Sequence, residues 1–270
     1  MINPILKREV TSKTRSWKFT GMITLYGLVL SFFSLIFFQS INRGNGMINL
    51  SAINGIFISL IVFIYFIICF VSPALTSSSI NSEKTSRTLD LLICAPISAR
   101  KIIIGKILSS LVSIVYLLII TMPLFSLLFM FGGLSILDIV IFALYFLLAT
   151  LYYGSIGVLF SSLFNKIAVS TVMSYIVIFF LNIATLIIGE GVPEIFGFSK
   201  DLKELFSYVM YLNPGYGLFI ISSRTNSNMH GVSINAHSPL TGVIIIIVIE
   251  IVLILLLNAL AIKKISPLKE

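Results

Sequence analysis

Residues 139–165 read IVIFALYFLLATLYYGSIGVLFSSLFN, an apolar run without a single charged side chain. Further uncharged runs cover residues 44–82, 107–137 and 167–189. A helix needs about 20 mostly apolar residues to cross a hydrocarbon core of about 30 Å, where it satisfies its own backbone polar groups. Because 58% of the residues are hydrophobic and only 10% are charged, the sequence predicts an all-α integral membrane protein. Within the quoted run, Gly154 and Gly157 lie one turn apart, which predicts close packing on a neighbouring helix.

The apolar runs predict six transmembrane helices within a single transmembrane domain that comprises residues 1–270. The spans are expected at residues 20–40, 51–75, 105–131, 136–161, 167–189 and 240–262. The domain is expected to divide into an amphipathic interfacial helix (1–19), spans one to five (20–189), an extracellular loop with re-entrant helices (190–239), span six (240–262) and a cytoplasmic tail (263–270).

Positive charges predict the orientation of these helices, because cytoplasmic loops carry an excess of lysine and arginine. If the N-terminus is inside, only Arg43, Lys200, Lys203 and Arg224 of the 18 basic residues fall in outer segments. We therefore expect a multi-pass protein of the cell membrane with both termini in the cytoplasm. This topology and the anionic lipid headgroups account for the net charge of +8, so no nucleic-acid partner is expected.

The inner connection between spans two and three is long and patterned. Asn81 or Ser82 can cap a helix, and Glu83 in its first turn suits the helix dipole. Leu89 and Leu92 share one face of that helix before Pro96 ends it. The pattern predicts a short amphipathic helix parallel to the membrane. A basic loop that lies on lipid headgroups is the alternative.

The outer connection between spans five and six carries a second pattern. Ser199 can cap a short helix, and Asn213 and Pro214 then break the chain before another apolar piece at residues 216–221. Neither piece is long enough to span the membrane. We expect both to be re-entrant from the outer surface, which requires that protein covers them, and we expect Asn213 and Pro214 to mark an outer gate.

Glu250 lies near the middle of span six, where a carboxylate is expensive to bury and is a functional hypothesis by default. It is a candidate for the substrate pathway, where it would bind a cationic group or carry a proton. The alternative is a neutral carboxyl, or one hydrogen-bonded to a polar residue on a neighbouring span such as Asn54 or Asn182.

The inner connection also carries a family resemblance. The segments Glu83-Lys84, Thr88 to Leu92, Ala95 to Ser98 with Arg100, and Gly105-Lys106 resemble the signature of ABC-2 type permeases, the membrane subunits of many ABC exporters. The opening residues 3–9, the later Leu212-Asn213-Pro214 and the six-span plan are similar to that family over nearly the whole chain. Two departures are Arg87 in place of a usual glycine and Thr85 in place of a second acidic residue.

This resemblance implies that residues 83–95 form a coupling helix that sits in a groove of a cytoplasmic ABC ATPase. It implies contact residues at Glu83, Lys84, Arg87, Thr88, Leu89, Asp90, Leu91, Leu92 and Pro96. The chain has no Gly-x-x-x-x-Gly-Lys-Ser/Thr motif, so we expect no enzyme activity and no cofactor in this chain, with ATP and magnesium on the partner ATPase. The resemblance also implies a second permease, either another copy or a related chain, and export of a peptide, drug or lipid-like substrate.

Two other classes of protein are alternatives to an ATP-driven permease. A secondary transporter or channel would use Glu250 and no ATPase, but such proteins often show inverted repeats, and the sequence shows none. A membrane enzyme would need a catalytic motif within the spans, and no His-Glu-x-x-His or nucleophile pair occurs there. The inner connection separates these classes, because only the permease needs it to bind another protein.

Overall fold

The computed structural model describes residues 11, 16–43, 50–85, 99–130, 136–225 and 239–265. All secondary structure in these ranges is helical, and six helices are long and apolar enough to cross a membrane. The six are α2 (Trp17–Arg43), α3 (Leu50–Ser77), α6 (Ala99–Met130), α7 (Ile136–Leu163), α8 (Ile167–Leu186) and α12 (Pro239–Ile265). The predicted all-α architecture and the six predicted spans are therefore confirmed for this part of the chain.

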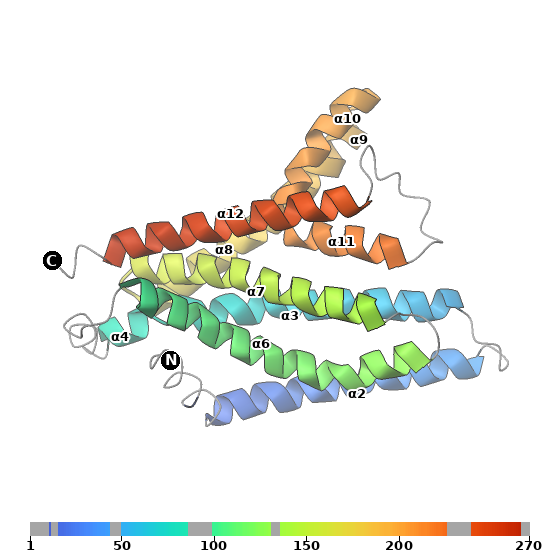
Figure 1. Cartoon of the computed structure of the whole chain (residues 1–270), viewed down its shortest axis with the longest axis horizontal. Coiled ribbons are helices and arrows are strands. Elements are labelled where there is room, and N and C mark those ends of the chain that lie inside the picture. Colours follow the sequence, from blue (N-terminus) through green and yellow to red (C-terminus); the bar gives the residue numbers. More distant parts are fainter. Residues whose placement is uncertain are drawn as a thin grey trace.

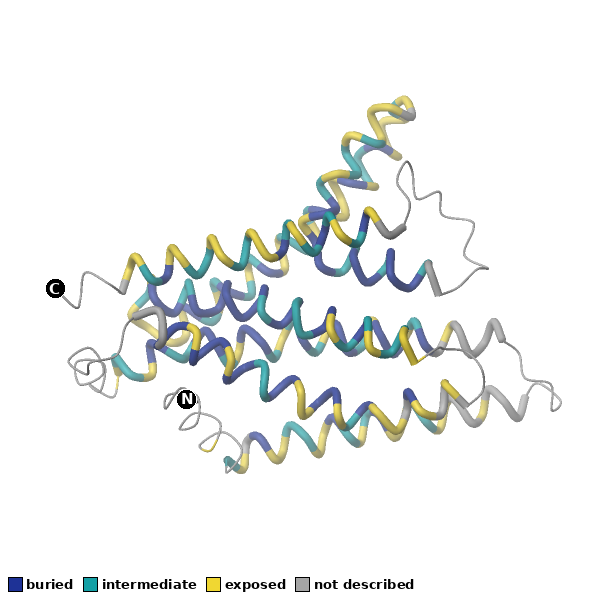
Figure 2. The backbone as a smooth tube through the Cα atoms, viewed as in Figure 1, coloured by how far each residue is buried: buried dark blue, intermediate teal, exposed yellow. Residues whose placement is uncertain are grey.

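Helix α7 lies at the centre of the bundle (Figure 1) and packs against α3, α12, α6 and α8. Its buried residues extend along most of its length, as Figure 2 shows, and include Phe142, Phe146 and Tyr153. An apolar helix with buried residues on all sides belongs in a core. Helix α7 is therefore the core helix against which α3, α6, α8 and α12 pack.

Helices α7 and α3 approach each other closely. A Cβ atom on Gly157 would overlap the hydroxyl of Thr76, and one on Gly154 would lie 3.3 Å from Ser72 Oγ. Ser72 Oγ also donates a hydrogen bond of 2.9 Å to the Thr150 carbonyl. The close packing predicted from the two glycines is confirmed, because α3 occupies the space that their missing side chains leave.

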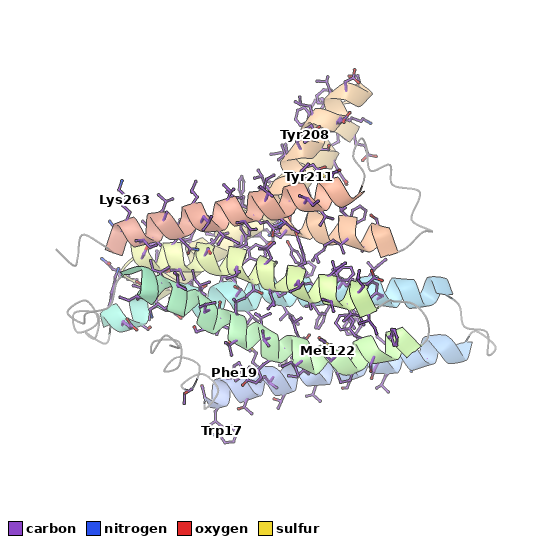
Figure 3. The ribbon with its side chains drawn as sticks, in the orientation of Figure 1. Trp17, Phe19, Met122, Tyr208, Tyr211 and Lys263 are labelled. Carbon is purple, nitrogen blue, oxygen red and sulfur yellow. The ribbon has the colours of Figure 1, made fainter. Side chains whose placement is uncertain are left out.

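Helix α2 lies at the edge of the bundle beside α6 and α3. Trp17 at its start is 90% exposed and points away from the other helices, whereas Phe19 is buried and packs edge-on against Tyr116 of α6 (Figure 3). An exposed tryptophan at the end of an apolar helix suits the headgroup region of a bilayer. The predicted interfacial helix before it falls almost entirely outside the described residues.

Both α2 and α12 have their chain-terminal ends at the same end of the bundle as the short helix α4 (Asn81–Thr85) (Figure 1). We call this the α4 end. An even number of spans requires that the first begins where the last ends. The side of the membrane on which the α4 end lies stays a prediction.

The opposite end carries the elements between spans five and six. These are η1 (Ile187–Gly191), α9 (Val192–Ile195), α10 (Lys200–Ser207), η2 (Tyr208–Leu212) and α11 (Pro214–Thr225). We call it the α11 end. Helix α10 projects from the bundle, whereas α11 packs on α12 and α7. The two helical pieces predicted on either side of Asn213 are confirmed, although Ser199 makes no side-chain capping bond. Their re-entry into the membrane stays a prediction.

Candidate functional site

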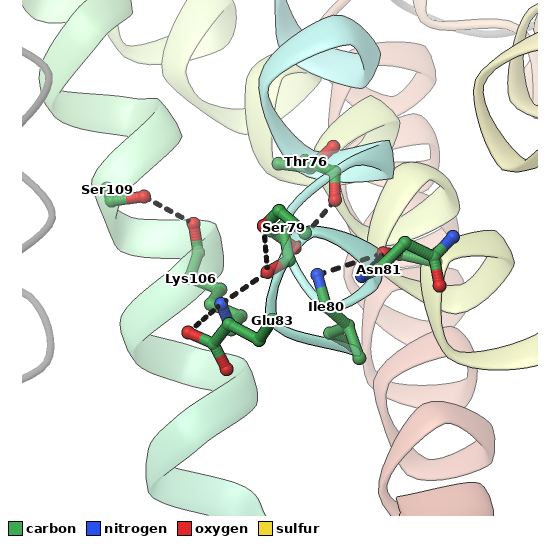
Figure 4. A network of polar contacts seen from close by, with 9 residues as sticks. Thr76, Ser79, Ile80, Asn81, Glu83, Lys106 and Ser109 are labelled. Carbon is green, nitrogen blue, oxygen red and sulfur yellow. Dashed lines mark hydrogen bonds and ion pairs between the residues drawn. The ribbon is translucent and has the colours of Figure 1, made fainter. Parts of the chain in front are cut away.

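Lys106 on α6 is the buried cation at the α4 end. Its side chain is almost completely buried, and Nζ donates hydrogen bonds to the Ser79 carbonyl (2.6 Å) and to Glu83 Oε1 (3.1 Å), as Figure 4 shows. The Glu83 side chain is 17% exposed. A buried charge needs a partner of opposite sign and further hydrogen bonds. The ion pair therefore fastens the start of the inner connection to span three.

Ser161 on α7 fastens the same turn from the other side. Its hydroxyl oxygen accepts hydrogen bonds from the backbone N–H groups of Ile80 (3.0 Å) and Asn81 (3.2 Å). The first N–H groups of a helix have no partner within the helix, so a side chain must supply one. The Asn81 side chain has no hydrogen-bond partner among the described residues, so it does not cap this helix there, and Ser82 Oγ donates to the Ser79 carbonyl.

Lys84 covers the connection between α7 and α8. Its Nζ donates to the carbonyl oxygens of Ser162 (3.4 Å) and Phe164 (3.5 Å) and to Asn165 Oδ1 (3.3 Å). Glu83 and Lys84 thus both bond within the chain. The other predicted coupling residues, Arg87, Thr88, Leu89, Asp90, Leu91, Leu92 and Pro96, lie outside the described residues.

Asn213 is the buried junction between η2 and α11. Its Nδ2 donates to Thr185 Oγ1 (2.9 Å) and to the Asn182 carbonyl (3.2 Å) on α8, and its Oδ1 accepts from the Gly215 N–H (2.8 Å). An asparagine that bonds its own backbone two residues on makes a tight turn, after which Pro214 can start a helix. The predicted chain break is therefore also the point that ties α11 to span five.

A cluster of hydroxyls continues from Asn213 into the bundle. Tyr65 Oη of α3 lies 3.2 Å from Asn213 Oδ1, 2.6 Å from Tyr153 Oη of α7 and 2.6 Å from Asn182 Oδ1 of α8. Asn182 Nδ2 donates to Tyr153 Oη (3.1 Å). Buried polar groups that satisfy one another fix one arrangement of their helices. The cluster therefore locks the α11 end to spans two, four and five.

Replacing Asn213 with leucine is expected to lower the free energy of unfolding by about 2 kcal/mol, because it leaves the Gly215 N–H without its acceptor and removes the hydrogen bond that Asn213 donates to Thr185 Oγ1. The matched control is Asn258→Leu on α12, which removes a single 3.3 Å bond to Ser155 Oγ and should change stability little. Unfolding of the purified protein by sodium dodecyl sulfate measures both. Equal effects of the two variants would contradict the structural role given to Asn213.

A cavity of about 950 Å³ lies beside this cluster, between α3, α8, η2 and α11. Its walls are mainly apolar and aromatic, with Phe66, Phe70 and Phe179 among them, and its few polar groups include Tyr65, Asn182 and Asn213. Such a composition suits a largely apolar ligand with a small hydrogen-bonding group. The predicted outer-gate residue Asn213 therefore contributes to the cavity wall.

Glu250 is fully buried between α12 and α7 and is not among the residues that line this cavity. Its Oε1 lies 2.6 Å from Tyr145 Oη, which also lies 2.9 Å from the Pro214 carbonyl oxygen. The expected partner Asn182 bonds elsewhere, and the side chain of Asn54 lies outside the described residues. Glu250 is thus hydrogen-bonded to a polar residue on a neighbouring span, as one alternative predicted, but that residue is Tyr145 of α7 and not the suggested Asn182.

The sequence does not single out Tyr65, Tyr145 or Tyr153, and it indicates for Ser161 only a place in the close packing of span four. Tyrosine and serine are ordinary residues in apolar helices, so their types alone carry no signal. Lys106 was noted only as part of a motif, although a lysine followed by a long uncharged run is the sign of a basic group at a membrane boundary. Their roles arise from contacts between distant parts of the chain.

A comparison with protein families gives one match, to a model described as ABC-2 family transporter protein, over residues 4–264. No curated protein matches the chain. The family match extends over all six candidate spans and over both polar sites. It confirms the resemblance found in residues 83–106. This chain therefore belongs to the ABC-2 family of transporter proteins and is a multi-pass membrane component of transport.

Proposed function

We propose that this chain is the membrane-spanning permease subunit of an ATP-driven exporter, in which a separate cytoplasmic ATPase drives substrate across the cell membrane. One observation carries the proposal: the residues that begin the family signature are fastened to the bundle by Lys106 of span three and Ser161 of span four. A partner that moves this segment would move those spans with it. The α4 end is then the cytoplasmic end, in agreement with the excess of basic residues there.

The coupling step follows from the rigidity of these contacts. Glu83 and Lys84 bind within the chain, so the ATPase would contact the residues that follow them, about 87–96. Closure of two ATPase subunits around ATP would push this segment, and the Lys106 ion pair would transmit the push to α6. Small shifts at such a packed contact are passed on as movements of whole helices.

The cavity between α3, α8 and α11 is the proposed route for substrate. Its apolar walls favour a peptide, drug or lipid-like molecule over a highly charged one. Asn213 and Pro214 at the start of α11 would form the outer gate, since a shift of α11 changes the wall of the cavity. A second permease, another copy or a related chain, would complete the route along the exposed apolar residues Val62, Phe66 and Phe179.

Co-purification tests the ATPase partner. The protein is extracted from membranes in mild detergent, as the wild type and as the variant Leu89→Asp/Leu92→Asp. Glu83 is left intact, because its loss would also break the Lys106 ion pair. We expect an ABC ATPase to co-purify with the wild type and to be lost from the variant.

The matched control for this experiment is Leu202→Asp/Leu205→Asp, which places the same substitutions on exposed positions of α10 at the opposite end. This control should retain the ATPase. An ATPase that stays bound to the Leu89→Asp/Leu92→Asp variant would contradict the coupling site. A folded wild-type protein that binds no ATPase would contradict the proposed function.

A further inference from the structure

The Tyr145 hydroxyl connects two acceptor-bearing groups on different elements. It lies 2.6 Å from Glu250 Oε1 on α12 and 2.9 Å from the carbonyl oxygen of Pro214, the first residue of α11. A phenol carries one hydrogen, and a backbone carbonyl can only accept. If Tyr145 donates to Pro214, the bond to Glu250 needs a hydrogen from the carboxyl group.

Burial favours this assignment of hydrogens. Glu250 is fully buried, and no lysine, arginine or histidine within the described residues forms an ion pair with it. Its second oxygen, Oε2, is buried and has no hydrogen-bond partner among the same residues. An ionised carboxylate in such a place loses its hydration without compensation, whereas a neutral acid loses far less.

The packing of α11 brings its backbone directly onto the same hydroxyl. A Cβ atom on Gly217 would overlap Tyr145 Oη, so α11 can approach α7 this closely only with glycine there. Gly215 stands in a similar relation to Tyr65, whose Oη lies 3.0 Å from the place of a Cβ atom. The first turn of α11 therefore rests on two buried tyrosine hydroxyls.

We propose that Glu250 is a neutral carboxylic acid that donates a hydrogen bond to Tyr145, and that Tyr145 donates to the Pro214 carbonyl. Glu250 is then a positioning residue: through Tyr145 it holds the first turn of α11, which forms one wall of the cavity. Ionisation of Glu250 would draw the Tyr145 hydrogen to the carboxylate and take it from Pro214.

Few other groups can compete for these hydrogens. Helix α12 packs against α7, α11, α6 and η2. On α7, Tyr145 and Tyr152 are the titratable residues that interact with Glu250. No hydrogen bond or ion pair joins Glu250 to a described residue of α11, α6 or η2. The hydrogen-bond chain therefore runs from α12 through α7 to α11 without a branch to a basic residue.

Infrared spectroscopy of the full-length protein in lipid nanodiscs tests the protonation directly. A neutral carboxylic acid has a C=O stretching band that a carboxylate lacks. We expect the band in the wild type at neutral pH, its loss in Glu250→Gln, and its displacement in Tyr145→Phe, where the acid loses its acceptor. A wild type without a band that depends on Glu250 would overturn the proposal.

Hydrogen–deuterium exchange tests the positioning role. Glutamine can still donate to Tyr145, whereas leucine fills a similar space without a hydrogen bond. We expect Glu250→Gln to leave the exchange of residues 215–220 unchanged, and Glu250→Leu to accelerate it about tenfold, the change expected for one lost buried hydrogen bond. Asn258→Leu, which removes another polar side chain of α12, should leave that segment unchanged.

If Glu250 only fills space, Glu250→Leu should leave the exchange of residues 215–220 unchanged, because leucine is well suited to a buried position in a membrane helix. Unchanged exchange in Glu250→Leu, or acceleration in Glu250→Gln equal to that in Glu250→Leu, would overturn the positioning role. The spectroscopic and exchange measurements do not depend on the proposed function. Only the consequence for substrate, which follows from α11 being a wall of the proposed route, rests on that function.

Discussion

Replacing Lys106 with methionine is expected to lower the free energy of unfolding by about 3 kcal/mol and to impair ATP-driven transport. The methionine fills most of the same space, but it removes the 2.6 Å hydrogen bond to the Ser79 carbonyl and leaves the Glu83 carboxylate without the ammonium group of its ion pair. Breaking a buried ion pair from one side costs about 3–5 kcal/mol, and the lower value applies here because Glu83 is 17% exposed. Unfolding in sodium dodecyl sulfate measures the change in stability.

A double-mutant cycle isolates the contribution of the ion pair. Glu83→Met, the second single variant of the cycle, leaves the buried Lys106 ammonium group without its carboxylate and should also lower stability. Lys106→Met/Glu83→Met removes both charges and should regain part of the lost stability, because two apolar side chains replace a desolvated pair. If the double variant is as unstable as the sum of the single ones, the two side chains do not interact as proposed.

The Lys106→Met variant also distinguishes a structural role of the ion pair within the chain from a role in binding the ATPase. Lys106 is buried and pairs with Glu83 of the same chain, so Lys106→Met should still co-purify with the ATPase. Transport should fall because α4 no longer moves together with α6. Loss of the ATPase from a folded Lys106→Met protein would place the ion pair at the partner interface instead.

Gly157→Ala is expected to destabilise the protein by about 2 kcal/mol, although alanine is normally the better residue in a helix. Its Cβ atom would overlap the Thr76 hydroxyl and lie 3.1 Å from the backbone nitrogen of Ser77. Thr76 cannot rotate away without losing its 2.9 Å bond to the Ser72 carbonyl. The α3–α7 contact at the centre of the bundle must therefore open. Unfolding in sodium dodecyl sulfate measures the loss.

Two other glycines provide graded controls for this prediction. Gly154→Ala places a Cβ atom 3.3 Å from Ser72 Oγ, which requires only a small shift and should cost less. Gly27→Ala on α2 meets no atom within 4 Å and should be neutral or stabilising by up to about 1 kcal/mol. Thr76→Ala should restore part of the stability lost in Gly157→Ala, because it removes the overlapping hydroxyl but not the contact with the Ser77 nitrogen. Equal effects at all three glycines would contradict the close approach.

The polar contacts within the bundle could not be predicted from the sequence. Asn81 and Ser82 have the residue types of a helix cap, yet the hydroxyl that serves the turn belongs to Ser161, some 80 residues later in the chain. The sequence indicates that Glu250 is an expensive buried carboxylate, but it does not identify Tyr145 as its partner. A tyrosine in an apolar helix has no local feature that tells whether its hydroxyl has a partner.

The sequence by itself determined the class of the molecule, its six spans, the close packing at Gly154 and Gly157, the break at Asn213 and the family, because each depends on local hydropathy or on residues close together in the chain. Only the tertiary structure decided that Lys106 pairs with Glu83, that Tyr65 reaches Asn213 and that Tyr145 joins Glu250 to Pro214. These contacts join different helices, and their geometry depends on how whole helices rotate and cross. Uniformly apolar spans carry little sequence information about that rotation.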